Sequence, residues 1–331
     1  MYDPPFLEHL RALVRVALPR WNLPATAALS LLNVSENATF LAEADGRRVV
    51  LRVYRQGYHQ QAEMESELAW ISALRAEAVV ETPAPLPGRD GRLLQVLPDG
   101  VVLRHAVAFA YMPGVEPQEN GALGPWFARL GGLTARLHAQ GRGWRRPPGF
   151  NRKRWDFSTM LGDAPHWGPW RAAIGLDAVG AAVLAGVAEQ LRADLLEYGD
   201  GPERFGLVHA DLRLTNLLVE GERLGVIDFD DCGFCWYLYD FAAAVSFMEH
   251  EPVVPALLRA WVGGYRQVAP LSAADVRMLP AFVMLRRMVL TAWLASHAET
   301  PTAQALGAGY TDGTVALGLR YLRGSLWHID C

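Results

Sequence analysis

The residues best suited to chemistry are Asp211 and Asn216, with Asp228 twelve positions further along the chain. A carboxylate and an amide five positions apart on one tight loop can face the same small volume. In phosphoryl transfer, such a carboxylate accepts the proton of the attacking hydroxyl, and the amide oxygen holds magnesium. Asp228 adds an anionic oxygen of the kind that Mg²⁺ prefers. The spacing therefore predicts a phosphotransferase with Asp211 as catalytic base and with Asn216 and Asp228 as metal ligands.

Short apolar segments on both sides of this loop are suited to position it. Residues 205–208 form an apolar run typical of a buried strand that leads into the loop. Residues 217–219 and 224–227 bracket a polar turn, which predicts a β-hairpin. Because so short a hairpin brings its ends together, we expect Asn216 to lie beside Asp228. The alternative, in which these residues merely form turns, is less favoured, since strand, loop and hairpin occur in the order that phosphoryl transfer needs.

Composition limits the class of protein. The 331 residues, 51% of them hydrophobic, are enough for two lobes with a large core. A net charge of −4 argues against a general nucleic-acid binder, which needs a basic face. The sequence contains no run of 18 uncharged apolar residues, which a membrane span would need. Its acidic, proline-rich N-terminus is unlike a secretion signal. We therefore expect a cytoplasmic protein with neither nucleic-acid nor membrane partners.

Cysteine usage adds little to the functional interpretation. The 3 cysteines cannot build a disulfide framework. Cys232 and Cys235 form a C-x-x-C pair directly after the predicted metal-binding segment, but no second pair for zinc accompanies them. We interpret both as structural or incidental thiols; the alternative is a site of oxidation or metal poisoning near the active site.

The pattern of apolar residues divides the chain into two predicted lobes and favours an α+β fold class. Residues 1–112 predict a nucleotide-binding N-lobe with an N-terminal helix, a helix at 60–76, and strands at 39–44, 48–54, 93–97 and 101–112. Residues 113–331 predict a mainly helical C-lobe that carries the catalytic loop, the metal ligands and the acceptor site. Its expected helices lie near 127–137, 183–195, 240–249 and 279–298, with irregular structure at 145–171.

Nucleotide contacts are predicted from the N-lobe. Arg52 lies near the end of a well-covered strand, where a cation can reach the α- and β-phosphates. Glu67 follows fifteen residues later on a helix, where it can orient that cation. The alternative is a surface arginine and a solvated glutamate. The turn at residues 33–38 lacks the usual glycines, so its backbone amides, with Ser35 or Asn37, are the candidate phosphate contacts.

With these pieces assembled, residues 27–250 resemble the aminoglycoside phosphotransferase and choline kinase superfamily. The motifs H-A-D-L-x-x-x-N at 209–216 and I-D-F-D-D at 227–231 are close to those of bacterial stress-response kinases and type II homoserine kinases. The resemblance implies a bilobal protein-kinase-like fold that binds MgATP between its lobes, with Asp211 as base and Asn216 and Asp228 on magnesium.

The resemblance implies further site residues. Residues 109–114 look like the family's hinge, where backbone groups of Ala110 and Met112 face adenine. Asp240 matches a position that braces the catalytic loop. Arg52 departs from the family pattern, which usually has lysine, and this change alters the geometry of the phosphate contact.

The sequence says least about the identity of the phosphoryl acceptor. Tyr239 lies only eleven positions after Asp228, which leaves no room for a long activation segment and favours a small hydroxylated acceptor. Charges in the expected acceptor region are mixed and do not select a polycation: Asp156, Asp163, Asp231 and Glu249 stand against Arg152, Lys153, Arg154 and Arg171.

Arg286 and Arg287 interrupt an otherwise apolar helix, so at least one should point inward. One interpretation is a structural ion pair with Asp240 or Glu249. The other is an anchor for a substrate carboxylate or phosphate, which an amino-alcohol acid such as homoserine would need.

These observations favour an ATP-dependent phosphotransferase that moves the γ-phosphoryl group of MgATP to a hydroxyl of an amino alcohol, a homoserine-like or a sugar-like metabolite. Two alternatives remain. One is a protein Ser/Thr kinase of the bacterial stress-response type. The other is a non-catalytic nucleotide-binding regulator, motivated by Arg52 and the glycine-free turn.

Overall fold

The computed structural model describes residues 4–34, 37–117 and 122–327, and these divide into two compact units. Unit 1 comprises residues up to 114 together with 145–152, and unit 2 comprises 115–144 together with the chain from 153 onward. The chain therefore passes between the units at three places, after residues 114, 144 and 152. Nothing in the sequence pattern indicated that residues 145–152 belong to unit 1.

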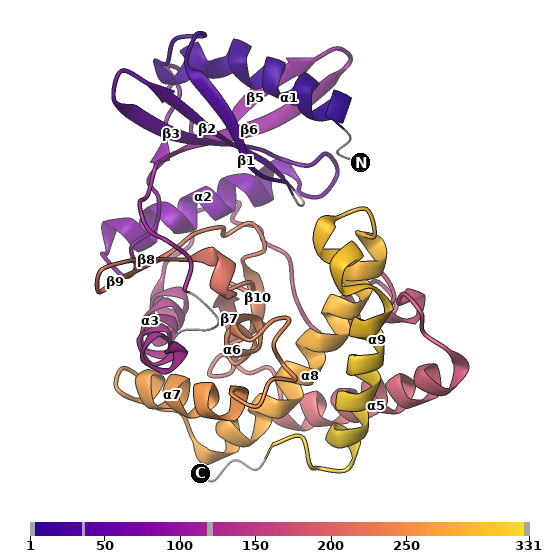
Figure 1. The fold of residues 1–331 in the computed structure, drawn as a ribbon. Helices are drawn as coiled ribbons and strands as arrows, with labels where there is room; N and C mark the ends of the chain where they lie inside the picture. Colours follow the sequence, from indigo (N-terminus) through magenta and orange to yellow (C-terminus); the bar gives the residue numbers. More distant parts are fainter. Residues whose placement is uncertain (1–3, 35–36, 118–121, 328–331) are drawn as a thin grey trace. The chain divides into compact units, whose positions relative to one another are not determined.

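An antiparallel sheet forms the centre of unit 1 (Figure 1). Its order is β1 (Ala28–Val34), β2 (Ala38–Ala44), β3 (Arg47–Val53), β6 (Val102–Ala110) and β4 (Pro85–Leu86), with β5 (Gln95–Asp99) also paired to β6. The β2–β3 turn forms as predicted, because Asp45 and Gly46 adopt φ angles of 51° and 73°, the left-handed pair that a tight hairpin requires.

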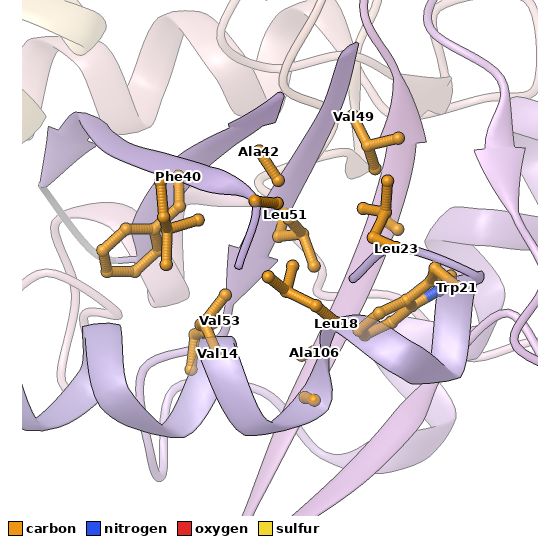
Figure 2. Packing of buried hydrophobic residues seen from close by; sticks show 14 of the residues in the cluster. Val14, Leu18, Trp21, Leu23, Phe40, Ala42, Val49, Leu51, Val53 and Ala106 are labelled. Carbon is orange, nitrogen blue, oxygen red and sulfur yellow. The ribbon is translucent and has the colours of Figure 1, made fainter. Parts of the chain in front are cut away.

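Two helices flank this sheet. Helix α1 (Pro4–Ala17), continued by the 3₁₀ turn η1 (Leu18–Trp21), buries Val14, Leu18 and Trp21 in a core with strand residues (Figure 2). The strand side of this core includes Phe40, Ala42, Val49, Leu51, Val53 and Ala106. Helix α2 (Gln61–Ala76) starts at a capping box between Gln60 and Glu63.

Unit 2 is mainly helical. Its helices and 3₁₀ turns are α3 (Leu123–Gly143), α4 (Phe157–Met160), η2 (Trp170–Ala172), α5 (Ala178–Tyr198), η3 (Leu214–Asn216), α6 (Tyr239–Ala244), α7 (Val254–Arg266), α8 (Ala273–Ser296) and α9 (Pro301–Leu322). Helices α3 and α7 approach closely because two glycines face the contact. A Cβ atom at Gly131 would lie 2.0 Å from the carbonyl oxygen of Trp261, and one at Gly264 would lie 1.8 Å from that of Ala128.

Helix α8 is the core helix of unit 2. By length and composition it could cross a membrane, but 83% of its most apolar window is buried inside the structure. Both Arg286 and Arg287 lie within this helix and are buried. The helix begins earlier than expected because Ser272 and Asp275 form a capping box ahead of the apolar run.

Four short strands carry the candidate site. Strand β7 (Phe205–Val208) pairs with β10 (Gly233–Trp236), and β8 (Leu217–Glu220) forms a hairpin with β9 (Arg223–Val226). Strand β7 and the hairpin agree with the sequence prediction, whereas β10 was not predicted. The small antiparallel sheet of unit 1 and the helices of unit 2 agree with the predicted α+β class.

Candidate active site

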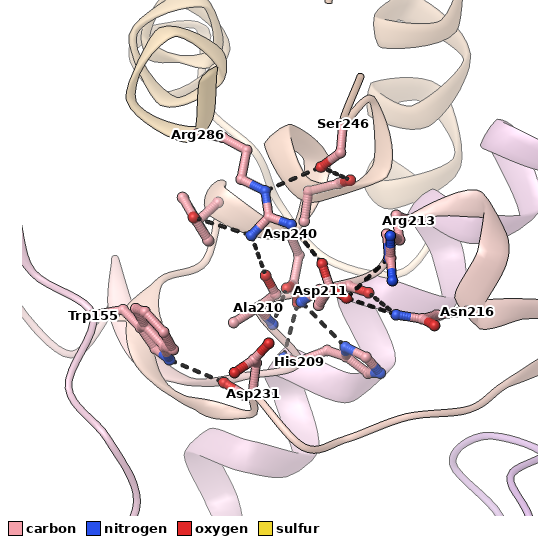
Figure 3. A network of polar contacts seen from close by, with 12 residues as sticks. Trp155, His209, Ala210, Asp211, Arg213, Asn216, Asp231, Asp240, Ser246 and Arg286 are labelled. Atoms are coloured by element: carbon pink, nitrogen blue, oxygen red, sulfur yellow. Dashed lines mark hydrogen bonds and ion pairs between the residues drawn. The ribbon is translucent and has the colours of Figure 1, made fainter. Parts of the chain in front are cut away.

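The loop after β7 brings Asp211 and Asn216 into contact. The Asn216 Nδ2 atom donates to Asp211 Oδ2 at 2.7 Å and to the Asp211 backbone carbonyl at 2.9 Å (Figure 3). At the base of the β8–β9 hairpin, the Ile227 amide donates to the Asn216 carbonyl at 2.9 Å. The hairpin thus brings Asn216 next to the residue that precedes Asp228, as its length predicted.

Two cations neutralise the Asp211 carboxylate. Arg286 Nη2 lies 2.5 Å from Oδ1, and Arg213 Nε lies 3.2 Å from Oδ2. Burial by itself would raise the pKa of Asp211, but the positive charges of Arg213 and Arg286 outweigh burial and hold this pKa below its ordinary value. Asp211 is therefore ionised at neutral pH.

Arg286 reaches the loop after β7 from helix α8 and forms several hydrogen bonds at once (Figure 3). Its Nε atom donates to Ser246 Oγ at 3.0 Å, and its Nη1 atom donates to the Ala210 carbonyl and to the Tyr239 hydroxyl, each at 3.3 Å. Its guanidinium carbon also lies 5.3 Å from the ring centroid of Trp167. This role in supporting the loop was not predicted, since the expected partners were Asp240, Glu249 or a substrate.

Arg287 behaves differently from its neighbour. Its Nη1 atom donates to Glu249 Oε2 at 2.7 Å, its Nε to Thr314 Oγ1 at 2.8 Å, and its Nη2 to the Tyr310 carbonyl at 3.0 Å. Its guanidinium carbon lies 3.4 Å from the centroid of the Tyr310 ring. The Arg287–Glu249 contact is the structural ion pair that was one of the two interpretations of this arginine pair.

Asp240 accepts hydrogen bonds from the backbone of the loop after β7. Its Oδ1 atom accepts from the Ala210 amide at 2.7 Å, and its Oδ2 atom accepts from the His209 amide at 3.3 Å. The Nε2 atom of His138 lies 3.0 Å from the same Oδ2. Ala210 has a φ of 66°, an unfavourable conformation for alanine that these bonds stabilise.

Unit 1 brings together the predicted phosphate-side pair. Arg52 Nη2 donates to Glu67 Oε1 at 2.6 Å and to Oε2 at 2.7 Å, and both residues are buried. The Tyr54 hydroxyl, which was not predicted, accepts from Arg52 Nη2 at 2.7 Å and donates to Glu67 Oε2 at 3.0 Å. The arginine is thus held by a carboxylate and a phenol.

The remaining predicted nucleotide contacts are less defined. Asn37 Oδ1 accepts from the Arg55 amide at 3.0 Å, so this side chain binds the backbone just after β3. The Ala110 amide donates to the Ala84 carbonyl at 2.8 Å, so an adenine contact from Ala110 would use its carbonyl oxygen. Met112 follows β6 and is partly exposed. The candidate Ser35 lies outside the described residues.

Several charges of the expected acceptor region are engaged within unit 2. Arg154 contacts Asp156 at 2.8 Å and Asp200 at 2.7 Å, and Asp156 also caps α4. Trp155 Nε1 donates to the Asp231 carbonyl at 2.9 Å (Figure 3). The position of Trp155 beside this loop was not predicted, because tryptophan content alone does not indicate where the rings lie.

Cys232 and Cys235 are both buried. Burial raises the pKa of the Cys235 thiol well above its ordinary value, which disfavours the reactive thiolate. This supports the structural interpretation of the pair.

Residues 30–271 match the model of the phosphotransferase enzyme family known as APH. The chain belongs to this family. A protein of Deinococcus radiodurans is 30% identical over 89% of this chain and 84% of its own length. A homoserine kinase of Gluconacetobacter diazotrophicus is 29% identical over 77% of this chain and 76% of its own.

Solved structures agree with this membership. The microcompartment-associated aminopropanol kinase is 45% identical and covers 96% of this chain and 99% of its own, with a TM-score of 0.89. The amicoumacin kinase hAmiN, solved with AMP-PNP, Ca²⁺ and Ami, shares the fold at 21% identity, with a TM-score of 0.77 over 99% and 96% of the two chains. The predicted family and protein-kinase-like fold are confirmed, and so is the predicted class of enzyme, a kinase that phosphorylates a hydroxyl group of a small molecule.

Proposed function

We propose that this enzyme transfers the γ-phosphoryl group of MgATP to the hydroxyl group of a small amino alcohol of the aminopropanol type. The observation that carries the proposal is the similarity to aminopropanol kinase along almost the whole of both chains. The homoserine kinases are more distant relatives and match a smaller share of the chain.

In this mechanism, Asp211 orients the acceptor hydroxyl and receives its proton. One carboxylate oxygen is held by Arg286 and the other by Asn216, so the side chain is oriented before the acceptor binds. A carboxylate with a lowered pKa is a weak base, which suits a reaction whose transition state depends mainly on alignment and charge stabilisation.

Asn216 and Asp228 are the proposed magnesium ligands. Because Asn216 Nδ2 faces Asp211, its amide oxygen is turned toward the opposite side, where it can serve as a ligand. The described residues hold no cluster of three or more His, Cys, Asp or Glu suited to a metal. One amide and one carboxylate oxygen suit Mg²⁺, which is commonly held by one or two protein oxygens together with phosphate and water, and which would neutralise charge on the phosphates when bound.

On the nucleotide side, Arg52 is the proposed contact to the α- and β-phosphates, with Glu67 and Tyr54 holding its guanidinium. A guanidinium offers a planar fork of donors where lysine offers a point charge, so it can contact two phosphate oxygens at once. Asn37, Ala110 and Met112 complete the proposed nucleotide contacts.

The charges of α8 favour an acceptor without a carboxylate. The sequence offered Arg286 and Arg287 as a possible anchor for a substrate carboxylate. In the structure, however, their guanidinium groups contact Asp211 and Glu249. A homoserine-like acceptor would have to compete for one of these buried ion pairs. The short segment after Asp228 also favours a small molecule over a protein acceptor.

An ADP-release assay with 1-amino-2-propanol, 3-amino-1-propanol, ethanolamine, choline and homoserine tests the proposal. We expect an aminopropanol to stimulate turnover most, and Asp211→Asn to lower kcat by about 10²–10⁴-fold while the Kd for MgATP changes little. Preferential turnover of homoserine, or stimulation by none of these compounds, would overturn the assignment of the acceptor.

A further inference from the structure

Residues 145–152 leave unit 2 after α3 and attach to helix α2 in unit 1. The side chain of Arg152 is 4% exposed, and its Nη1 atom donates to the Glu63 carbonyl oxygen at 2.8 Å. The amide of Asn151 donates to Ser66 Oγ at 2.8 Å, and this hydroxyl donates to the Ala62 carbonyl at 2.6 Å. Two adjacent residues of the segment thus bind one turn of α2.

That turn is the one that carries Glu67. In an α-helix, the carbonyl of residue 63 accepts the amide of residue 67, so Arg152 binds the same oxygen that receives the Glu67 N–H. Ser66, the second attachment point, directly precedes Glu67. The carboxylate of Glu67 in turn binds Arg52 and Tyr54.

The start of α2 is also linked to Tyr54, through His59. Glu63 Oε2 accepts from the Gln60 amide at 2.8 Å and lies 3.7 Å from His59 Nδ1. The His59 ring packs edge-on against Tyr54, with centroids 6.5 Å apart. A displacement of this turn would therefore disturb both groups that hold the Arg52 guanidinium.

We propose that Arg152 is a positioning residue for ATP binding, which secures the Glu63–Glu67 turn of α2 so that Glu67 directs Arg52 toward the phosphates. This inference rests on the proposed role of Arg52. Arg152 acts through helix α2, because it donates to the backbone carbonyl of Glu63. The neighbouring hydrogen bond from Asn151 to Ser66 supports the same turn.

A double-mutant cycle between Arg152→Ala and Glu67→Ala tests the proposal in the full-length enzyme. We expect Arg152→Ala to raise the KM for ATP by about tenfold, as for loss of a charged hydrogen bond, with the acceptor KM changed less than about twofold. In the Glu67→Ala background, the same substitution should have little further effect on the KM for ATP. Arg152→Lys, which keeps a donor for the Glu63 carbonyl, should restore part of the affinity.

Arg145→Ala is the matched control, because Arg145 lies in the same segment and is exposed. Ser66→Ala provides a milder second variant, which should raise the KM for ATP by a smaller factor and couple to Glu67→Ala in the same way. Circular dichroism and thermal unfolding establish that each variant is folded.

Additive effects of Arg152→Ala and Glu67→Ala, or equal losses in ATP and acceptor parameters, would overturn the positioning role. Failure of the proposed function has a different signature: Arg52→Ala and Glu67→Ala would leave the KM for ATP unchanged in otherwise folded enzyme. That result would remove the basis of the inference as well.

Discussion

Arg286 and Asp211 form a buried ion pair, with Nη2 of the arginine 2.5 Å from Oδ1 of the carboxylate. The two residues are 75 positions apart in the chain, and helix α8 supplies the arginine. Since Asn216 binds the other carboxylate oxygen, Asp211 has little rotational freedom. In the proposed mechanism, the position of the acceptor hydroxyl therefore depends on α8 as well as on the loop after β7.

Arg286→Lys should lower kcat by about 10–100-fold while leaving the KM for ATP nearly unchanged. Lysine keeps the charge, but it cannot contact Asp211, the Ala210 carbonyl and Ser246 together. Steady-state kinetics with the best acceptor measure the effect. Arg277→Lys is the control, because Arg277 is exposed on the same helix; a wild-type kcat in Arg286→Lys would contradict the positioning of Asp211 by this side chain.

Asp228→Ala should remove the magnesium dependence of ATP binding. We expect the affinity for MgATP to fall at least about tenfold, while the weaker binding of metal-free ATP is preserved. Calorimetry with and without EDTA measures both values, and exposed Asp163→Ala serves as the control. An unchanged difference between the two conditions would show that Asp228 does not hold the metal.

Arg287→Met should lower the free energy of unfolding by about 3–5 kcal/mol, because it leaves Glu249 buried without its arginine. Replacing Glu249 by leucine in the same chain should recover much of this loss. Urea unfolding monitored by circular dichroism gives the values. If the single variant is fully stable but binds the acceptor poorly, the substrate-anchor interpretation of Arg287 is correct.

His138 should make the protein less stable at mildly acidic pH. Burial lowers the pKa of His138 below its ordinary value of 6.5, with Asp240 opposing the shift and Arg142 adding to it. As pH falls below 6.5, the unfolded chain gains a proton that the folded chain does not, so stability decreases. The nearby Tyr265 does not titrate in this range, since its pKa is raised to about 12.

His138→Gln should reduce this pH dependence. Between pH 7.5 and 5.5, we expect the variant to lose about 1 kcal/mol less unfolding free energy than the wild type. Urea unfolding at the two pH values tests this, with His250→Gln as an exposed control. Parallel losses in variant and wild type would mean that His138 takes up its proton in the folded state.

Much of the site could be predicted because its geometry is local. The strand before Asp211, the hairpin after Asn216 and the strand that carries Arg52 lie within short stretches whose apolar spacing and turn residues are characteristic. The Arg52–Glu67 contact joins a strand to the next helix along the chain, so both of its residues could be predicted from the sequence. These features required no knowledge of how distant segments pack.

Contacts between distant segments could not be predicted in the same way. The sequence indicated that at least one of Arg286 and Arg287 points inward, but it left open which carboxylate would be its partner. In the structure both are buried, and one pairs with Asp211 and the other with Glu249. Likewise, the proline- and glycine-rich stretch at 145–152 carries no periodic pattern that would assign it to helix α2. Such choices depend on packing, because many charged partners are equally compatible with the sequence.

The threefold passage of the chain between units has a consequence for recombination. A gene fragment that ends near residue 114 would encode the strands and helices of unit 1 but not the segment that holds its second helix. Exchange of unit 1 with that of a related enzyme should therefore succeed only when residues 145–152 are exchanged with it. Chimaeras made with one crossover would inherit a mismatched attachment for α2, whereas chimaeras with three crossovers would keep it intact.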